Sequence, residues 1–198
     1  MKKFMCLAAI AVIIPSLVFA ERLKVSSLTV NEPERAGKIK AFADVTFNES
    51  ITVKGIRLIE VSKGMFIGMP SEKKGDRWYD FCYSRDKELS SAIQTAIETK
   101  TPEKITDKDK TVAVTRIDIR PYKSSKLKAW VKITLNDSFV INSIKILESK
   151  KGDYIEFPSR KAVRNTWEPV VEAVNKKVKD EIEKAVLAEY KKKSSKGK

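Results

Sequence analysis

The 198-residue chain contains no histidine. Histidine is the commonest general base near neutral pH and a favoured zinc ligand, so this absence argues against the usual acid–base and zinc chemistries. None of the seven glycines belongs to a phosphate-binding loop. The carboxylates are scattered among lysines rather than gathered in pairs. We therefore expect a protein that is not an enzyme and that has no catalytic residues, no cofactor and no metal site.

Cysteine is nearly absent as well, and the first of the two residues, Cys6, lies in an N-terminal segment typical of a secretory signal peptide. Residues 1–20 combine two lysines, a short apolar run and small residues before Ala20. We expect cleavage after Ala20 and export to the periplasm or the medium; an uncleaved anchor is the alternative, which Pro15 and the short run disfavour. Cleavage leaves Cys82 alone, without an intrachain disulfide or a stable membrane span.

An internal duplication organises the rest of the chain. Residues 38–71 align without a gap against residues 126–159, and 13 of the 34 aligned pairs are identical. Each copy opens with a strand of period two, from Ile39 to Phe47 and from Leu127 to Leu135, and turns through Asn-acid-Ser. The pattern predicts an antiparallel meander in each copy.

The second strand of each copy changes its apolar phase at Gly55 or Ser143, which predicts a β-bulge at both positions. A Lys-Gly turn then leads to a third short strand that ends at Pro-Ser. Extending the alignment, with a shift of one residue, pairs Trp78 with Trp167. Residues 168–190 alone could form one long helix, but the extended alignment predicts a short strand followed by a helix.

The aligned helices have candidate N-caps at Asp86 and Asn175. The composition of Tyr79 to Tyr83 predicts a strand, and that of Thr101 to Thr111 predicts a polar linker. We predict the α+β class, with two tandem domains that each contain a small antiparallel meander and a C-terminal helix. The expected divisions are a signal peptide (1–20), a first domain (21–100), a linker (101–111), a second domain (112–192) and a basic disordered tail (193–198).

The net charge is +14, and it falls to +12 once Lys2 and Lys3 leave with the signal peptide. Basic loops at equivalent places in the two copies could contact a phosphate backbone, or they could be solvated loops that maintain solubility. Phe42 and Trp130, each flanked by lysine, could stack on bases, but we expect a helix or a partner sheet to cover them. The candidate nucleic-acid-binding residues are Lys73, Lys74, Arg77, Arg160, Lys161 and Arg164.

The order of these motifs resembles the SpoVG (stage V sporulation protein G) family. The best stretches are SFVINSIKILESKKGDYIEFPSRK (138–161) and KAVLAEY (184–190), and ITVKGIRLIEVSKGMFIGMPS (51–71) looks like the same unit in the first copy. The resemblance implies a small α+β domain that dimerises, and a regulator of septation and sporulation that binds nucleic acid. It favours the binding interpretation of the basic loops.

Two departures from the family pattern matter. The family unit is ordinarily single and cytosolic, whereas this chain has two units behind an export signal. Because the family unit dimerises, we expect the two fused units to pair as an intramolecular pseudo-dimer. The lead hypothesis is that this pseudo-dimer binds DNA, RNA or another polyanion. The alternative is an exported module that binds an anionic envelope surface or a protein partner.

Overall fold

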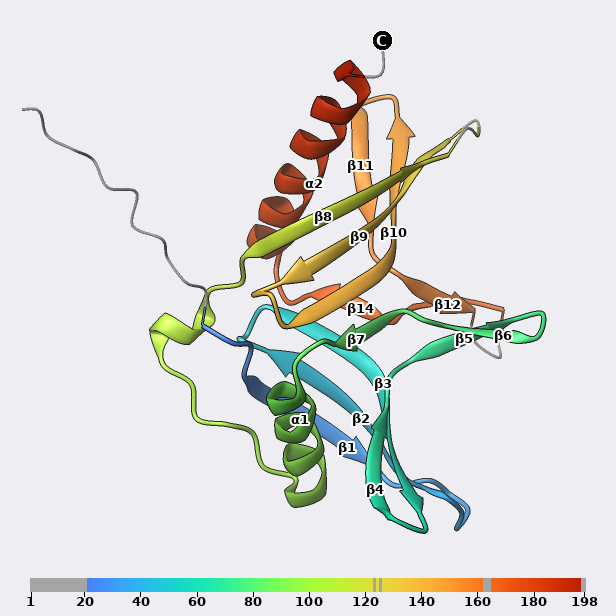
Figure 1. Ribbon diagram of the computed structural model, residues 1–198, viewed down its shortest axis with the longest axis vertical. Coiled ribbons are helices and arrows are strands. Elements are labelled where there is room, and N and C mark those ends of the chain that lie inside the picture. The colour runs from blue at the N-terminus through green and yellow to red at the C-terminus, as the bar shows by residue number, and fades with distance from the viewer. Residues whose placement is uncertain (1–20, 123, 125, 162–164, 197–198) are drawn as a thin grey trace, which may run out of the picture.

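A computed structural model describes residues 21–122, 124, 126–161 and 165–196. The predicted signal peptide and Arg164 lie outside the described residues. The structure contains two five-stranded antiparallel sheets, two short hairpins and two long helices (Figure 1). In the first half the elements are β1 (Val25–Asn31), β2 (Ile39–Phe47), β3 (Ile51–Val61), β4 (Gly64–Gly68), β5 (Ser71–Lys74), β6 (Arg77–Asp80), β7 (Cys82–Ser84) and α1 (Lys87–Thr99).

The second half repeats this order after the short 3-10 helix η1 (Asp107–Lys110). Its elements are β8 (Val114–Pro121), β9 (Leu127–Leu135), β10 (Phe139–Ser149), β11 (Gly152–Glu156), β12 (Ser159–Lys161), β13 (Trp167–Pro169), β14 (Val171–Ala173) and α2 (Lys176–Lys196). The predicted meanders correspond to β2–β4 and β9–β11. The helix α2 continues to Lys196, so residues 193–196 are helical and not the disordered tail that we expected.

The turns of the two meanders follow directly from their sequence. Asn48 and Glu49 have φ values of 51° and 49°, and Asn136 and Asp137 have 46° and 53°. Two successive residues with positive φ make the type I′ turn that suits the twist of a two-residue hairpin, and asparagine tolerates this conformation. The predicted bulges are also present, because the register of β3 and β10 shifts beside Gly55 (φ 79°) and Ser143 (φ 61°).

The two halves exchange one strand each. The first sheet has the order β1-β2-β3-β14 with β4 also paired to β3, and the second has β11-β10-β9-β8 with β7 also paired to β10. Strand β14 of the second half therefore completes the sheet of the first, where Val171 pairs with Val53. Strand β7 of the first half completes the sheet of the second, where Cys82 pairs with Ile141.

One hydrophobic core runs through both halves. The rings of Phe47 and Phe139, from different halves, lie with centroids 5.1 Å apart, and both side chains are fully buried. Helix α1 packs against the first sheet, and α2 packs against β8, β11 and β14 (Figure 1). Asp86 caps α1 by accepting a hydrogen bond from Glu88 N, and Asn175 caps α2 by accepting one from Val178 N.

Three sequence predictions need correction. The strand expected from Tyr79 to Tyr83 is broken at Phe81, because its buried ring and its N–H bond to Pro70 O turn the chain between β6 and β7. The basic loops are hairpins, β5–β6 and β12–β13. Phe42 is 38% exposed on the outer face of its sheet, because the helix packs on the opposite face. The prediction that a helix or a partner sheet covers Phe42 is therefore wrong.

Candidate nucleic-acid interface

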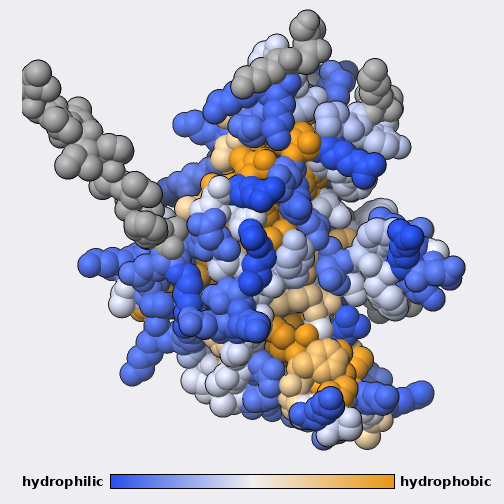
Figure 2. All heavy atoms as spheres, viewed as in Figure 1, coloured by the Kyte–Doolittle hydropathy of each residue, from blue (hydrophilic) through white to orange (hydrophobic). Residues whose placement is uncertain are grey.

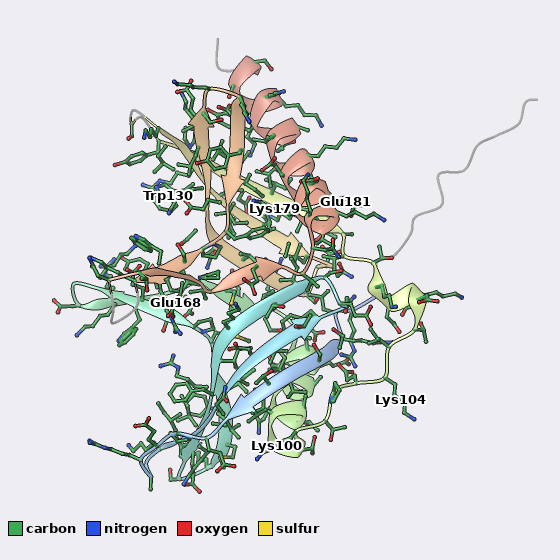
Figure 3. All side chains as sticks on the ribbon, turned by 180° about the vertical axis from the view of Figure 1, so that it is seen from behind. Lys100, Lys104, Trp130, Glu168, Lys179 and Glu181 are labelled. Carbon is green, nitrogen blue, oxygen red and sulfur yellow. The ribbon has the colours of Figure 1, made fainter. Side chains whose placement is uncertain are left out.

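Two short hairpins carry the predicted basic residues. Lys73 and Lys74 lie on β5 and Arg77 on β6, on either side of a turn that Gly75 (φ 60°) forms. Arg160 and Lys161 lie on β12 of the second hairpin. Figure 1 shows the hairpins projecting together at the right of the molecule, and Figure 3 shows them together from behind. The structure thus brings basic residues 88 positions apart in the sequence onto one projection.

Each hairpin presents a tryptophan directly opposite a lysine. Lys73 pairs with Trp78 across the first hairpin, and Lys161 pairs with Trp167 across the second. Trp78 and Trp167 are 64% and 66% exposed, far more than is usual for tryptophan. In Figure 2 the hydrophilic colours dominate this projection, which fits a contact surface for a charged partner rather than a packing surface.

These tryptophans were not among the site residues predicted from the sequence, where they served only to align the two copies. The available signal was their recurrence at equivalent positions beside basic segments. A tryptophan within a few residues of lysine and arginine suits a surface that binds bases or phosphates, because its ring can stack while the cations neutralise charge.

Contacts with the sheets hold each hairpin at the end where it leaves the sheets. Arg57 on β3 donates from Nη2 to Met69 O at 3.0 Å and to Ser71 Oγ at 3.4 Å, where the first hairpin begins. The guanidinium of Arg160 lies over the bulge of the first sheet, so that a Cβ on Gly55 would be 3.1 Å from Arg160 Nη1. Arg160 therefore joins the second hairpin to the first half, whereas Lys161 is exposed beside Trp167.

Among the described residues, neither a metal-binding cluster nor a reactive thiol stands beside this interface as a second candidate site. They contain no group of three or more Cys, Asp or Glu side chains that could hold a metal ion. Cys82 is fully buried, and burial, followed by the charge of Asp80, raises the pKa of its thiol, so this thiol stays protonated and is a poor nucleophile. None of the helices in the described parts of the chain has the length and apolar character of a membrane span.

Comparison with known proteins identifies the family. The model of the SpoVG family matches residues 23–101 and again residues 112–192. The chain belongs to the SpoVG family. The tandem copies and the α+β class predicted from the sequence are confirmed.

Three SpoVG relatives each match 35–42% of the chain, which is one of its two copies. A protein of Agathobacter rectalis named "Putative septation protein SpoVG" is 38% identical over 79 residues, which cover 39% of this chain and 91% of the relative. Proteins of the same name from Anaeromyxobacter sp. (strain Fw109-5) and Lachnospira eligens are 31% and 37% identical, covering 42% and 35% of this chain and 87% and 80% of their own lengths.

Proposed function

We propose that this SpoVG-family protein is a non-enzymatic nucleic-acid-binding protein whose two hairpins contact the phosphate backbone. The observation that carries the proposal is the pair of adjacent hairpins, each with a lysine opposite an exposed tryptophan. Basic side chains release counterions when they neutralise phosphates, which favours binding to any nucleic-acid sequence. The names of the relatives suggest that the protein acts in septation.

The hairpins suit a polyanion better than they suit a small ligand. Lys73, Arg77 and Lys161 are exposed and stand on two-stranded hairpins. Lys74 is partly neutralised, since its Nζ lies 2.9 Å from Glu72 Oε2. Contacts between basic side chains and phosphates position a protein on a nucleic-acid backbone without selecting a sequence.

The test is the salt dependence of affinity for an oligonucleotide, measured by fluorescence anisotropy. Log affinity should fall with log salt by about 0.7 per phosphate contact on a single strand and about 0.9 on a duplex. The triple variant Lys73→Ala, Lys74→Ala, Arg77→Ala should weaken binding and flatten this slope by about 2 to 3. The variant Arg160→Ala, Lys161→Ala, Arg164→Ala should act in the same direction.

A matched control separates local contact from net charge. Lys87, Lys104 and Lys108 are exposed and lie outside the hairpins, and Figure 3 shows Lys104 on the opposite side of the molecule. Replacing all three by alanine removes the same charge, and it should leave the slope nearly unchanged. Equal effects of the control and hairpin variants would reduce the binding to a general effect of net charge and would contradict the proposal.

A second candidate function is binding to an anionic envelope surface. Exposed tryptophans beside basic residues also suit the interface of a lipid bilayer, and the predicted signal peptide would take the protein to the envelope. Vesicles with and without phosphatidylglycerol, titrated beside the oligonucleotide, distinguish the two functions. Tight binding to anionic vesicles without binding to the oligonucleotide would favour the second.

A further inference from the structure

The outer face of the second sheet has a half-buried tryptophan between two cations. Trp130 on β9 pairs with Arg120 on β8 and with Lys145 on β10. Neighbouring strands lie about 4.8 Å apart, so these side chains form one row across the sheet. The row continues to the second hairpin, because Lys145 Nζ lies 5.8 Å from the centroid of the Trp167 ring. Cationic and aromatic side chains therefore alternate from the sheet edge to the proposed phosphate-binding hairpin.

A pocket of about 360 Å³ lies beside Trp130. It is lined by residues 118–120 of β8, residues 130–132 of β9 and Ser143 at the bulge of β10. Two residues along the same strands, Lys132 Nζ lies 3.4 Å from Asp118 Oδ2. Partial burial acts to raise the pKa of Asp118, but Arg116 and Lys132 outweigh it and lower the pKa, so Asp118 presents a carboxylate to the pocket at neutral pH.

In the first sheet, side chains of the protein occupy the position that is equivalent to this pocket. There Asp44 stands at the position of Lys132, and its Oδ1 accepts a hydrogen bond of 3.0 Å from Gly55 N at the bulge. The guanidinium of Arg160 also lies against Gly55, within 3.1 Å of the place that a Cβ would take. In the second sheet, Lys132 stands where the first has Asp44 and pairs with Asp118 of β8, and a pocket lies beside Ser143 at the bulge.

We propose that the pocket beside Trp130 holds one base of a single-stranded nucleic acid, stacked on the indole. This inference rests on the proposed function and adds the class of nucleic acid. The indole offers the stacking surface, and Asp118 and Lys132 offer an acceptor and a donor to the polar edge of the base.

The charges around the pocket favour one placement of the strand. The carboxylate of Asp118 repels a phosphate inside the pocket, whereas Arg120 and Lys145 lie in line with Trp130, where a backbone would pass. Lys145 is partly neutralised, since its Nζ lies 3.2 Å from Glu156 Oε2, so Arg120 is the main cation of this row. In Figure 3, Trp130 lies on the same side of the molecule as the hairpin that carries Glu168, so one strand can reach both. The bases of a duplex are stacked on each other and cannot insert in this way.

Fluorescence of Trp130 tests the inference directly. The chain has three tryptophans, so the double variant Trp78→Phe, Trp167→Phe leaves Trp130 as the sole reporter. Titration with oligo(dT) or oligo(rU) of about 12 nucleotides, within the usual site size, should quench this fluorescence to saturation. A duplex of the same length should leave it unquenched. Stronger quenching by the DNA or the RNA oligonucleotide shows which source supplies the base.

A pair of substitutions provides the independent check. Trp130→Leu should lower single-strand affinity by roughly tenfold, within the range expected for loss of one stacked base, and should keep the salt slope, because stacking releases no counterions. Phe42→Leu, at the equivalent position over the filled place, should change affinity by less than about twofold. Thermal melting of both variants confirms that they fold.

The outcomes distinguish this inference from the proposed function. Unquenched Trp130 fluorescence, or equal losses in Trp130→Leu and Phe42→Leu, would overturn the pocket even if the hairpin variants flatten the salt slope. Unchanged slopes in the hairpin variants would overturn the phosphate contacts instead. Because the reporter protein retains Trp130, its result does not depend on whether Trp130→Leu folds.

Discussion

Asp109 is the charged residue that the described part of the chain buries most completely. Its Oδ1 lies 2.6 Å from Lys24 Nζ, and its Oδ2 accepts hydrogen bonds from Thr106 N and Oγ1 at 2.6 and 2.9 Å. The hydrogen bond from Lys24, followed by that from Thr106 N, lowers the pKa of Asp109, and the same pair raises the pKa of Lys24. This ion pair ties the start of the first half to the segment that joins the halves.

We predict that Asp109→Asn lowers the melting temperature at pH 7. Because the folded pKa of Asp109 lies below its unfolded value of about 3.9, its contribution is present above that pH and is lost as the pH falls through the folded pKa. The raised pKa of Lys24 acts at the other limit, so its contribution is lost as the pH rises past about 10.4. Circular dichroism melts at pH 3, 7 and 11 measure both limits.

Asp107→Asn is the matched control for this prediction, because Asp107 lies in the same 3-10 helix with its side chain 98% exposed. Its melting temperature should change little, since exposed ion pairs contribute little to stability. An equal loss in both variants, or a loss in Asp109→Asn that is the same at every pH, would contradict the assigned role of the buried pair.

At the residue scale, local features were predictable from the sequence and distant partners were not. The Asn-acid turns, the bulges at Gly55 and Ser143 and the N-caps depend on residues a few positions apart, and they were predicted at the right places. The burial of Asp109 depends on Lys24, which lies far away in the sequence and has no pattern that identifies its partner.

At the scale of the elements, the exchanged strands are the main feature of the fold. Strands β7 and β14 contain three residues each, and each pairs with a central strand of the other half. The period of two predicted which face a strand buries, but it does not name the neighbouring strand, so the exchange could not be predicted. The hairpins were read as loops, because their residues are mostly charged and exposed and show no apolar alternation.

Phe139 tests the exchange, because it pairs with Ser84 of β7 and packs against Phe47. We predict that Phe139→Ala lowers the free energy of unfolding by about 3–5 kcal/mol, the usual cost of truncating a buried phenylalanine. Cys82, buried on β7, should then react faster with a thiol reagent. Urea denaturation and the labelling rate of residues 21–198 measure the two effects.

The control for Phe139→Ala is Tyr154→Ala, which removes a ring that is 39% exposed on β11. It should cost less stability and should not accelerate labelling of Cys82. If Phe139→Ala destabilises the protein and the labelling rate stays at that of the unchanged chain, β7 does not depend on this contact.

At the scale of the whole molecule, the exchange makes each half incomplete on its own. Residues 112–192 lack β7 beside β10 and leave β14 without β3. We predict one chain per particle for residues 21–198, because the short linker keeps the two halves at an effective concentration of about millimolar. The isolated second half should self-associate or unfold. Light scattering after gel filtration measures both, and a stable monomeric half would contradict the prediction.

The tandem arrangement was predictable, since the repeat and the family resemblance both appear in the sequence. The shared core was not, because the contact of Phe47 with Phe139 requires knowledge of how the halves meet. The same limit applies to the site: the basic residues were predicted individually, whereas their gathering on one projection depends on the exchange of β7 and β14.

Covalent fusion of the halves also frees them from having to be identical. In an assembly of two identical subunits, a substitution at the sheet bulge appears twice, once on each side of the symmetry axis. Here the two bulges differ. Arg160 lies against Gly55 at the first bulge, whereas Lys132 and Ser143 line a pocket at the second. If the two proposals hold, a strand bound to both Trp130 and the hairpins would meet a surface without a twofold axis, and the chain would distinguish its 5′ end from its 3′ end.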